Sequence, residues 1–206
     1  LGFHFVKTEL SASATESEIL GAIRRLNADE KIHGIIVQLP LPPGINADRI
    51  IAAIDPDKDA DGFLAASVRT PVFPEAMIEL AKSSGAPLSG KSGVVLVNSE
   101  RFGKMMGNAL RREGMSVEYV FPDDMGASRS MISRSDFVFT ALGRPETISR
   151  NMFKKDAVVI DGGIAKRDGK IVGDISGERD DADIFLSPVP GGVGPVTVAC
   201  LLRRVA

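Results

Sequence analysis

The chain has 206 residues, of which 44% are hydrophobic and 25% are charged, a balance that excludes disordered and fibrous proteins. Its 25 lysine and arginine residues oppose 27 aspartate and glutamate residues, and no basic block suits a nucleic acid or a lipid surface. The single cysteine excludes an intramolecular disulfide, and no apolar run approaches the roughly 18 residues of a membrane span. We therefore expect a cytoplasmic protein that binds neither nucleic acid nor membrane.

The first third of the chain predicts a strand, a helix, a strand and a helix. Residues 1–5 resemble a strand entered in mid-fold, so we expect the chain to be part of a longer protein. The capping box of Thr15 and Glu18 predicts a helix with apolar residues at helical spacing. The apolar run at 34–39 predicts a buried parallel strand, and Asn46 caps a second helix.

A boundary between two lobes is predicted at residues 55–74, which have no clear period and contain three prolines. Beyond it, strand and helix patterns alternate. Strands are predicted at 93–97, 116–121, 136–141 and 157–160, helices at 74–81, 103–112, 127–134, 149–153 and 197–205, and a β-ribbon at 164–171. This alternation predicts an α/β fold whose second lobe is a doubly wound parallel sheet.

Ligands of such a sheet bind beyond the carboxyl ends of its strands. The loops expected there are residues 98–99, 122–124, 142–145, 162–163 and 187–195. The last of these is the most unusual string in the chain, because its prolines and glycines specify a rigid, sharply bent backbone. We expect it to contact a ligand.

The loop after the first strand of this lobe departs from the Gly-x-Gly-x-x-Gly pattern of dinucleotide folds. Only Gly103 stands where that pattern needs a glycine, and the β-carbons of Val97 and Asn98 would crowd a pyrophosphate. Asp123 and Asp124 end the next strand, where an acid holds ribose hydroxyls and repels a 2'-phosphate. They favour NAD over NADP, although a solvated acidic turn explains them equally well.

Several other polar residues are candidates for function. Gln38 is a polar residue near the carboxyl end of the predicted strand at 34–39. Asp59 and Asp61 form either a paired-carboxylate metal site or a capped turn. His4 and His33 lack a second ligand at metal-binding spacing, so we assign them structural roles and predict no metal site. Cys200 is interpreted as a core residue of the last helix.

Taken together, these strings resemble the bifunctional methylenetetrahydrofolate dehydrogenase and methenyltetrahydrofolate cyclohydrolase family. The most specific matches are Val-Gln-Leu-Pro-Leu-Pro at 37–42 and Pro-Val-Pro-Gly-Gly-Val-Gly-Pro at 188–195. Further matches follow in the same order along nearly the whole chain, at residues 26–27, 33–36, 56–63, 161–164, 173–174 and 197.

The resemblance implies two lobes around a cleft, a homodimer, a tetrahydrofolate derivative in the cleft and NADP on a Rossmann-like lobe. Residues 1–70, completed by the C-terminal helix at 196–206, would form part of the folate lobe, and residues 71–195 the dinucleotide lobe. The family oxidises 5,10-methylenetetrahydrofolate and hydrolyses the methenyl product to 10-formyltetrahydrofolate, in one-carbon metabolism.

The resemblance also assigns roles to residues. Gln38 would orient the catalytic lysine and water, and Asp61 would bind the pterin ring. The residues that would line the folate site are Pro190, Gly191 and Gly192, and those that would contact the cofactor are Asn98, Ser99, Ile164 and Thr197.

The chain departs from the family pattern at several positions. The family's Tyr-x-x-x-Lys, which carries the cyclohydrolase lysine, would lie upstream of Leu1, and Tyr119 is followed four places later by Asp123 and not by a lysine. Asn98 stands in place of the arginine that meets a 2'-phosphate, and Met105 in place of a helix-opening proline. After Phe63 the chain is shorter than the pattern, and Val-Phe replaces the family's Cys-Thr at 72–73.

Three hypotheses about function follow. The first is a folate enzyme of this family whose activity needs the upstream motif. The second is a non-catalytic relative that has lost cofactor binding, which the side chains at 97 and 98 would explain. The third is a dehydrogenase of another small substrate that uses NAD on the same architecture.

Overall fold

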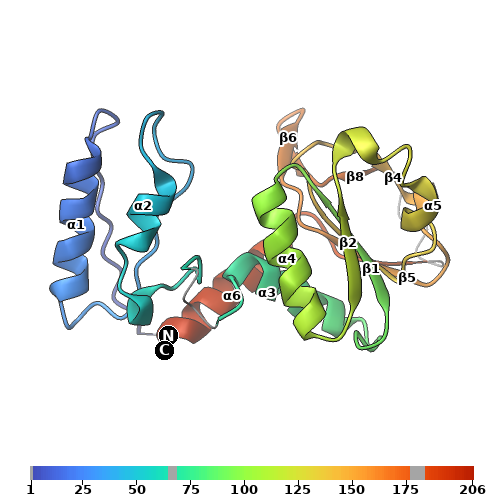
Figure 1. Ribbon diagram of the computed structural model, residues 1–206, viewed down its shortest axis with the longest axis horizontal. Coiled ribbons are helices and arrows are strands. Elements are labelled where there is room, and N and C mark those ends of the chain that lie inside the picture. Colours follow the sequence, from blue (N-terminus) through green and yellow to red (C-terminus); the bar gives the residue numbers. More distant parts are fainter. Residues whose placement is uncertain (1, 65–68, 177–183) are drawn as a thin grey trace. The chain divides into compact units, whose positions relative to one another are not determined.

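The computed structural model describes residues 2–64, 69–176 and 184–206. The chain divides into two compact units, one formed by Leu1–Arg69 with Arg203–Ala206 and the other by Thr70–Leu202 (Figure 1). Of the helices in the described ranges, none combines the length and apolar composition that a membrane crossing needs.

Two α-helices and one short 3-10 helix lie among residues 2–64. The capping box that opens α1 (Glu16–Ala28) is present as predicted, because Thr15 and Glu18 each bind the backbone N–H of the other. The side chain of Asn46 caps α2 (Ala47–Ala52) by accepting from two backbone N–H groups. The core between these elements is a cluster of buried isoleucines, namely Ile19, Ile23, Ile35, Ile50 and Ile54.

Both strands predicted for this unit are wrong. Residues 2–5 form no strand, and the run at 34–39 contributes a single parallel bridge between Ile35 and Asp59. Ile35 is buried, whereas the side chain of Ile36 is 50% exposed, so only part of the run enters the core. A strand needs a neighbour to pair with, and no strand is present among residues 2–64.

Two of the family-matched residues hold the first unit together. The amide of Asn27 at the end of α1 donates to the carbonyl oxygen of Ala53 at 2.8 Å and accepts from the N–H of Asp55 at 3.0 Å. Lys58 ends the short 3-10 helix η1 (Pro56–Lys58), and its ammonium donates to the carbonyl oxygens of residues 26, 27 and 29. Asn27 and Lys58 therefore clamp the end of α1 to the segment that carries Asp59 and Asp61.

A five-stranded parallel sheet forms the second unit and confirms the predicted α/β fold (Figure 1). Its order is β2-β1-β3-β5-β9, and every pairing is parallel. The strands are β1 (Ser92–Val97), β2 (Ser116–Val120), β3 (Phe137–Ala141), β5 (Ala157–Asp161) and β9 (Ile184–Leu186). The predicted ribbon is also confirmed, as β6 (Ala165–Arg167) pairs antiparallel with β7 (Lys170–Val172).

Helices cover both faces of this sheet, as a doubly wound fold requires. Successive residues of β1 alternate between two cores, with Val95 and Val97 packed on one face and Val94 and Leu96 on the other. The first core includes residues of α3 (Val72–Ser83), α4 (Glu100–Arg112) and α6 (Val193–Val205), and the second includes Ile132 of α5 (Arg129–Ile132).

The structure corrects the predicted ends of several helices. Helices α3, α4 and α6 begin two, three and four residues earlier than predicted, at Val72, Glu100 and Val193. The prolines at 74 and 195 fall within the first turns, where the missing N–H breaks no helical hydrogen bond. The second unit also contains short elements of two or three residues, namely β4 (Ile148–Ser149), β8 (Ile175–Ser176), η2 (Pro122–Asp124) and η3 (Arg150–Met152).

Candidate functional site

The five predicted ligand loops lie at one edge of the second unit. Each follows the last residue of β1, β2, β3, β5 or β9, and these strands are all parallel. Because parallel strands end at the same edge, the prediction that these loops gather beyond the carboxyl ends is confirmed.

A cavity of about 110 Å³ opens at this edge. It brings together Ile164, predicted to contact the cofactor, and the three residues predicted to line the folate site, Pro190, Gly191 and Gly192. The side chain of Ile164 is 62% exposed although it is apolar. A second cavity, of about 380 Å³, shares Asp161 and residues 188–190 with the first.

The rigid loop at 187–195 needs its glycines for two different reasons. A β-carbon on Gly192 would collide with the carbonyl oxygen of Pro188, so the backbone there is folded on itself. Gly191 has a φ of 104°, which side chains rarely adopt, and a β-carbon there would meet no atom within 4 Å. The space beside the backbone of Gly191 is therefore open.

The loop after β1 fits a dinucleotide better than its sequence suggests. Val97 is fully buried in the core, so the β-carbon at the loop surface is that of Asn98. The hydroxyl of Ser99 caps α4, with the Phe102 N–H donating to it at 3.5 Å. A β-carbon on Gly103 would lie 2.8 Å from the ring of Tyr119 on β2, which is the close packing that the last glycine of a dinucleotide motif provides.

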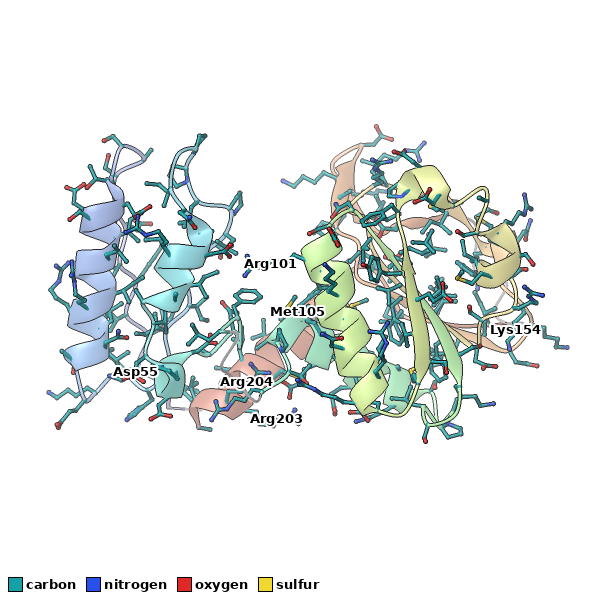
Figure 2. All side chains as sticks on the ribbon, in the orientation of Figure 1. Asp55, Arg101, Met105, Lys154, Arg203 and Arg204 are labelled. Atoms are coloured by element: carbon teal, nitrogen blue, oxygen red, sulfur yellow. The ribbon has the colours of Figure 1, made fainter. Side chains whose placement is uncertain are left out.

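The two residues that depart from the family pattern near this loop have defined places. The amide nitrogen of Asn98 donates to the carbonyl oxygen of Leu142 at 2.9 Å. Met105 is half-buried on α4, one turn beyond Arg101 (Figure 2). Asp123 and Asp124 are both exposed in η2, directly beyond β2, so their charges face solvent at the ligand edge.

The remaining predicted cofactor residue lies on α6. Thr197 is half-buried, and its hydroxyl donates to the carbonyl oxygen of Val193 one turn earlier at 2.8 Å. It is absent from the lining of the two cavities described above, as are Asn98 and Ser99.

Asp59 and Asp61 in the first unit have different surroundings. The buried carboxylate of Asp59 accepts from the N–H groups of Gly62 and Leu64, both at 2.9 Å, so it organises a turn. Asp61 is half-buried, and burial together with the charge of Asp59 raises its pKa from 3.8 to about 6. Arg204, on the last turns of α6, opposes this rise (Figure 2).

Gln38 is exposed, and its amide donates to the carbonyl oxygen of Leu39 at 2.9 Å. The peptide bond from Leu39 to Pro40 is cis. The parallel bridge between Ile35 and Asp59 pairs the two segments three residues before Gln38 and two residues before Asp61.

Sequence reasoning assigned no role to three charged residues that contact the strand-end loops or Asp61. Asp161 and Asp174 are among the buried charged residues of the second unit, and Arg204 interacts with Asp61. The signal for the two acids was that each adjoins a glycine in a matched string, Gly162 after Asp161 and Gly173 before Asp174. Nothing in the sequence pairs Arg204 with a residue so far away along the chain.

Comparisons with known proteins agree with this arrangement. Residues 71–206 match the family model described as tetrahydrofolate dehydrogenase/cyclohydrolase, NAD(P)-binding domain, and residues 1–61 match its catalytic domain. The chain is 40% identical over 207 residues to the Bifunctional protein FolD of Exiguobacterium sibiricum, covering 95% of the chain and 74% of that relative. The FolD of Bacillus subtilis is 37% identical, with 99% and 76% covered.

Solved structures give the same result. The dehydrogenase-cyclohydrolase of Trypanosoma brucei, complexed with NADP cofactor and inhibitor, has a TM-score of 0.90 at 34% identity, covering 99% of this chain and 75% of that one. The bifunctional FolD of Campylobacter jejuni has a TM-score of 0.87 at 33% identity, covering 94% and 73%.

Proposed function

Because the chain belongs to the tetrahydrofolate dehydrogenase/cyclohydrolase family, we propose that it acts on tetrahydrofolate derivatives in one-carbon metabolism. It oxidises 5,10-methylenetetrahydrofolate with a nicotinamide dinucleotide and hydrolyses 5,10-methenyltetrahydrofolate to 10-formyltetrahydrofolate. The observation that carries this proposal is the cavity that unites Ile164 with Pro190, Gly191 and Gly192.

The two lobes divide the work in this proposal. Residues 71–195 form the dinucleotide lobe and residues 1–70 with 196–206 the folate lobe, although Thr197 also serves the dinucleotide and the loop at 187–195 also serves the folate. A bound nicotinamide dinucleotide supplies a hydride acceptor for the oxidation. Asn98, Ser99, Ile164 and Thr197 contact the dinucleotide, while the loop at 187–195 fixes the folate ring with backbone that has little freedom to move.

Asp61 and Gln38 act on the folate. The carboxylate of Asp61 is ionised above its pKa of about 6, and it then accepts hydrogen bonds from the donor edge of the pterin ring. The exposed amide of Gln38 orients the hydrolytic water and the family's catalytic lysine. Gln38 is therefore proposed to serve the hydrolysis, whereas Asp61 serves binding in both reactions.

We propose that the preferred cofactor is NAD. Asp123 and Asp124 place two exposed carboxylates directly beyond β2, and such charges repel a 2'-phosphate. Asn98 stands where the family pattern has an arginine, so the cation that would attract that phosphate is replaced by a neutral amide. We also propose that the protein is cytoplasmic and that, as the resemblance implies, it forms a homodimer.

The test combines cofactor titration with two assays on the protein. Reduced nicotinamide should form from 5,10-methylenetetrahydrofolate with NAD, and faster than with NADP, while methenyl absorbance should fall during hydrolysis. Gln38→Ala should lower the rate of hydrolysis more than that of oxidation, whereas Asp61→Asn should raise the folate KM in both. If neither dinucleotide binds, the non-catalytic relative is the correct hypothesis.

A further inference from the structure

Buried polar residues lie beneath the loops that follow β3, β5 and β9. Thr140 is the residue before the last of β3, Asp161 is the last residue of β5, and Asp174 lies two residues after β7. Their exposed fractions are 0%, 3% and 0%. Ser187, which opens the loop at 187–195, is exposed by 2%. Four buried polar side chains of this kind need partners, and each finds them among the others or in the loops.

Asp161 binds the loops after β5 and β9 at the same time. Its carboxylate accepts from the N–H groups of Gly163 at 2.9 Å, Asp174 at 3.2 Å and Ile175 at 3.1 Å. Its own N–H donates to the hydroxyl oxygen of Ser187 at 2.8 Å. One residue thus fixes the turn that presents Ile164 and the start of the loop that contains Pro190.

Asp174 binds the loop after β3. Its carboxylate accepts from the N–H of Leu142 at 2.7 Å and from the N–H of Arg144 at 2.9 Å, on either side of Gly143. Leu142 is also the residue whose carbonyl oxygen accepts from Asn98. The carboxylate of Asp174 therefore fixes the loop to which the end of β1 is tied.

The hydroxyl of Thr140 lies between the two carboxylates. It is 2.7 Å from Asp174 Oδ2 and 3.2 Å from Asp161 Oδ1. A hydroxyl has one hydrogen, so it donates to the nearer oxygen, Asp174 Oδ2, and its lone pairs are left to face Asp161. Burial raises the pKa of Asp161 and the charge of Asp174 adds to that rise, while the backbone N–H groups of Asp174, Ile175 and Gly163 oppose it.

Two glycines are required by this cluster. A β-carbon on Gly163 would overlap the carboxylate of Asp174, and one on Gly173 would overlap the carboxylate of Asp161. The two strings at 161–164 and 173–174 are therefore complementary, since the acid of each occupies the space that a side chain would need in the other. This packing gives a structural reason for both matched strings.

From these contacts we propose that Thr140, Asp161 and Asp174 act as one positioning unit, which sets the places of the strand-end loops for dinucleotide binding. The proposal rests on the proposed function, because the loop after β5 presents Ile164 to the dinucleotide and the loop after β3 is bound to Asn98. Thr140 is a positioning residue and not a catalytic one, since it lines neither cavity and its side chain contacts Asp161, which lines both, through its hydroxyl.

The experiment compares two substitutions at one position. Thr140→Val keeps the shape but removes the hydroxyl, whereas Thr140→Ser keeps the hydroxyl and removes a methyl group. A matched control is Ser135→Ala, because Ser135 is also buried but donates to the carbonyl oxygen of Met131, outside the cluster. Hydrogen exchange of the amides of Leu142, Arg144 and Gly163 is followed, together with titration by NAD and by NADP.

Thr140→Val should speed exchange at these amides by about tenfold and weaken dinucleotide binding by a similar factor, since bonds to charged groups are the strong ones. The KM for the dinucleotide should rise more than kcat falls. Thr140→Ser and Ser135→Ala should stay within about twofold of the wild type. Wild-type exchange in Thr140→Val, or equal acceleration in Ser135→Ala, would overturn the proposal.

A second substitution keeps the test decisive if Thr140→Val fails to fold. Ser187→Ala removes the acceptor for the N–H of Asp161, and should accelerate exchange at Asp161 and, through Thr140 and Asp174, at Leu142. Acceleration at Asp161 alone, or at neither amide, would contradict a single positioning unit. Failure of the wild-type protein to bind any dinucleotide would count against the proposed function, while the exchange rates would still decide the structural role of Thr140.

Discussion

The side-chain amide of Asn98 donates a hydrogen bond to the carbonyl oxygen of Leu142 at 2.9 Å. This bond joins the end of β1 to the loop after β3, its neighbour in the sheet. Asn98 thus links two loops of the ligand edge, at the position where the family pattern has an arginine. In the proposed function, this neutral residue and the two acids beyond β2 are the groups that favour NAD.

We expect the replacement of Asp123 and Asp124 by serine to shift binding toward NADP. Removing two carboxylates beside a 2'-phosphate should raise the affinity for NADP relative to NAD by about tenfold or more, because each charge pair contributes about 1 kcal/mol in water. The ratio of the two dissociation constants measures this shift. Glu118→Ser removes an exposed acid of β2 itself and should leave the ratio unchanged. An unaltered ratio in the double variant would contradict our assignment of NAD preference.

Asp61 should make the stability of the protein depend on pH. Its folded pKa, about 6, lies above its usual value of 3.8, so the folded state binds the proton more tightly than the unfolded chain. The stabilisation from this proton is present below about pH 4 and is lost as pH rises through about 6. Asp61→Asn should therefore be more stable than the wild type at pH 8, by about 1 kcal/mol after allowance for solvent screening.

Urea unfolding at a series of pH values measures this difference. The advantage of Asp61→Asn should shrink as the pH falls and vanish near pH 4. A control is Asp57→Asn, which removes an exposed carboxylate of η1 and should show no such pH-dependent gain. Parallel curves for Asp61→Asn and the wild type between about pH 4 and 8 would show that the pKa of Asp61 is not raised.

Gly163→Ala should destabilise the second unit. The added β-carbon would overlap the carboxylate of Asp174, so the buried cluster must shift, at a cost of about 2 to 3 kcal/mol. Gly126→Ala is the matched control, because a β-carbon there meets no atom within 4 Å. Thermal unfolding should separate the two variants by several degrees. Equal midpoints would show that the space around Gly163 is not limiting.

Lys58→Met should weaken the first unit. The ammonium of Lys58 donates to three carbonyl oxygens at the end of α1, and methionine preserves the length of the chain but none of those bonds. We expect a loss of about 2 kcal/mol in the free energy of unfolding, measured with denaturant. Lys31→Met removes an exposed ammonium near the same helix end and should cost less than about 0.5 kcal/mol. A similar loss in both variants would argue against the clamp.

The sheet of the second unit could be predicted because its strands are strongly marked. The runs in β1, β3 and β5 are apolar and buried on both faces, which is the pattern of a parallel sheet. Strands of two or three residues, such as β4 and β8, carry too short a pattern to detect. The run at 34–39 has the composition of a strand but lacks a partner, and composition alone cannot reveal that.

The candidate site was predictable only where a loop follows a strand. Positions such as Ile164 and Gly191 could be placed at one edge because parallel strands end together. The pairing of Asp161 with Asp174 could not, because it depends on how the β6–β7 ribbon folds back over β5. The influence of Arg204 on Asp61 could not be predicted either, since the two residues lie 143 positions apart in the sequence.

The clamp of Asn27 and Lys58 also bears on how activity can be diagnosed in relatives of this protein. A lineage that abandoned the folate reaction would still benefit from keeping both residues, because losing them would destabilise the first unit. Their presence in a genome sequence thus reports on folding. Under the proposed function, Gln38, which is exposed and forms no part of the isoleucine core, would be free to change once hydrolysis is no longer needed, and would be the better marker of a working enzyme.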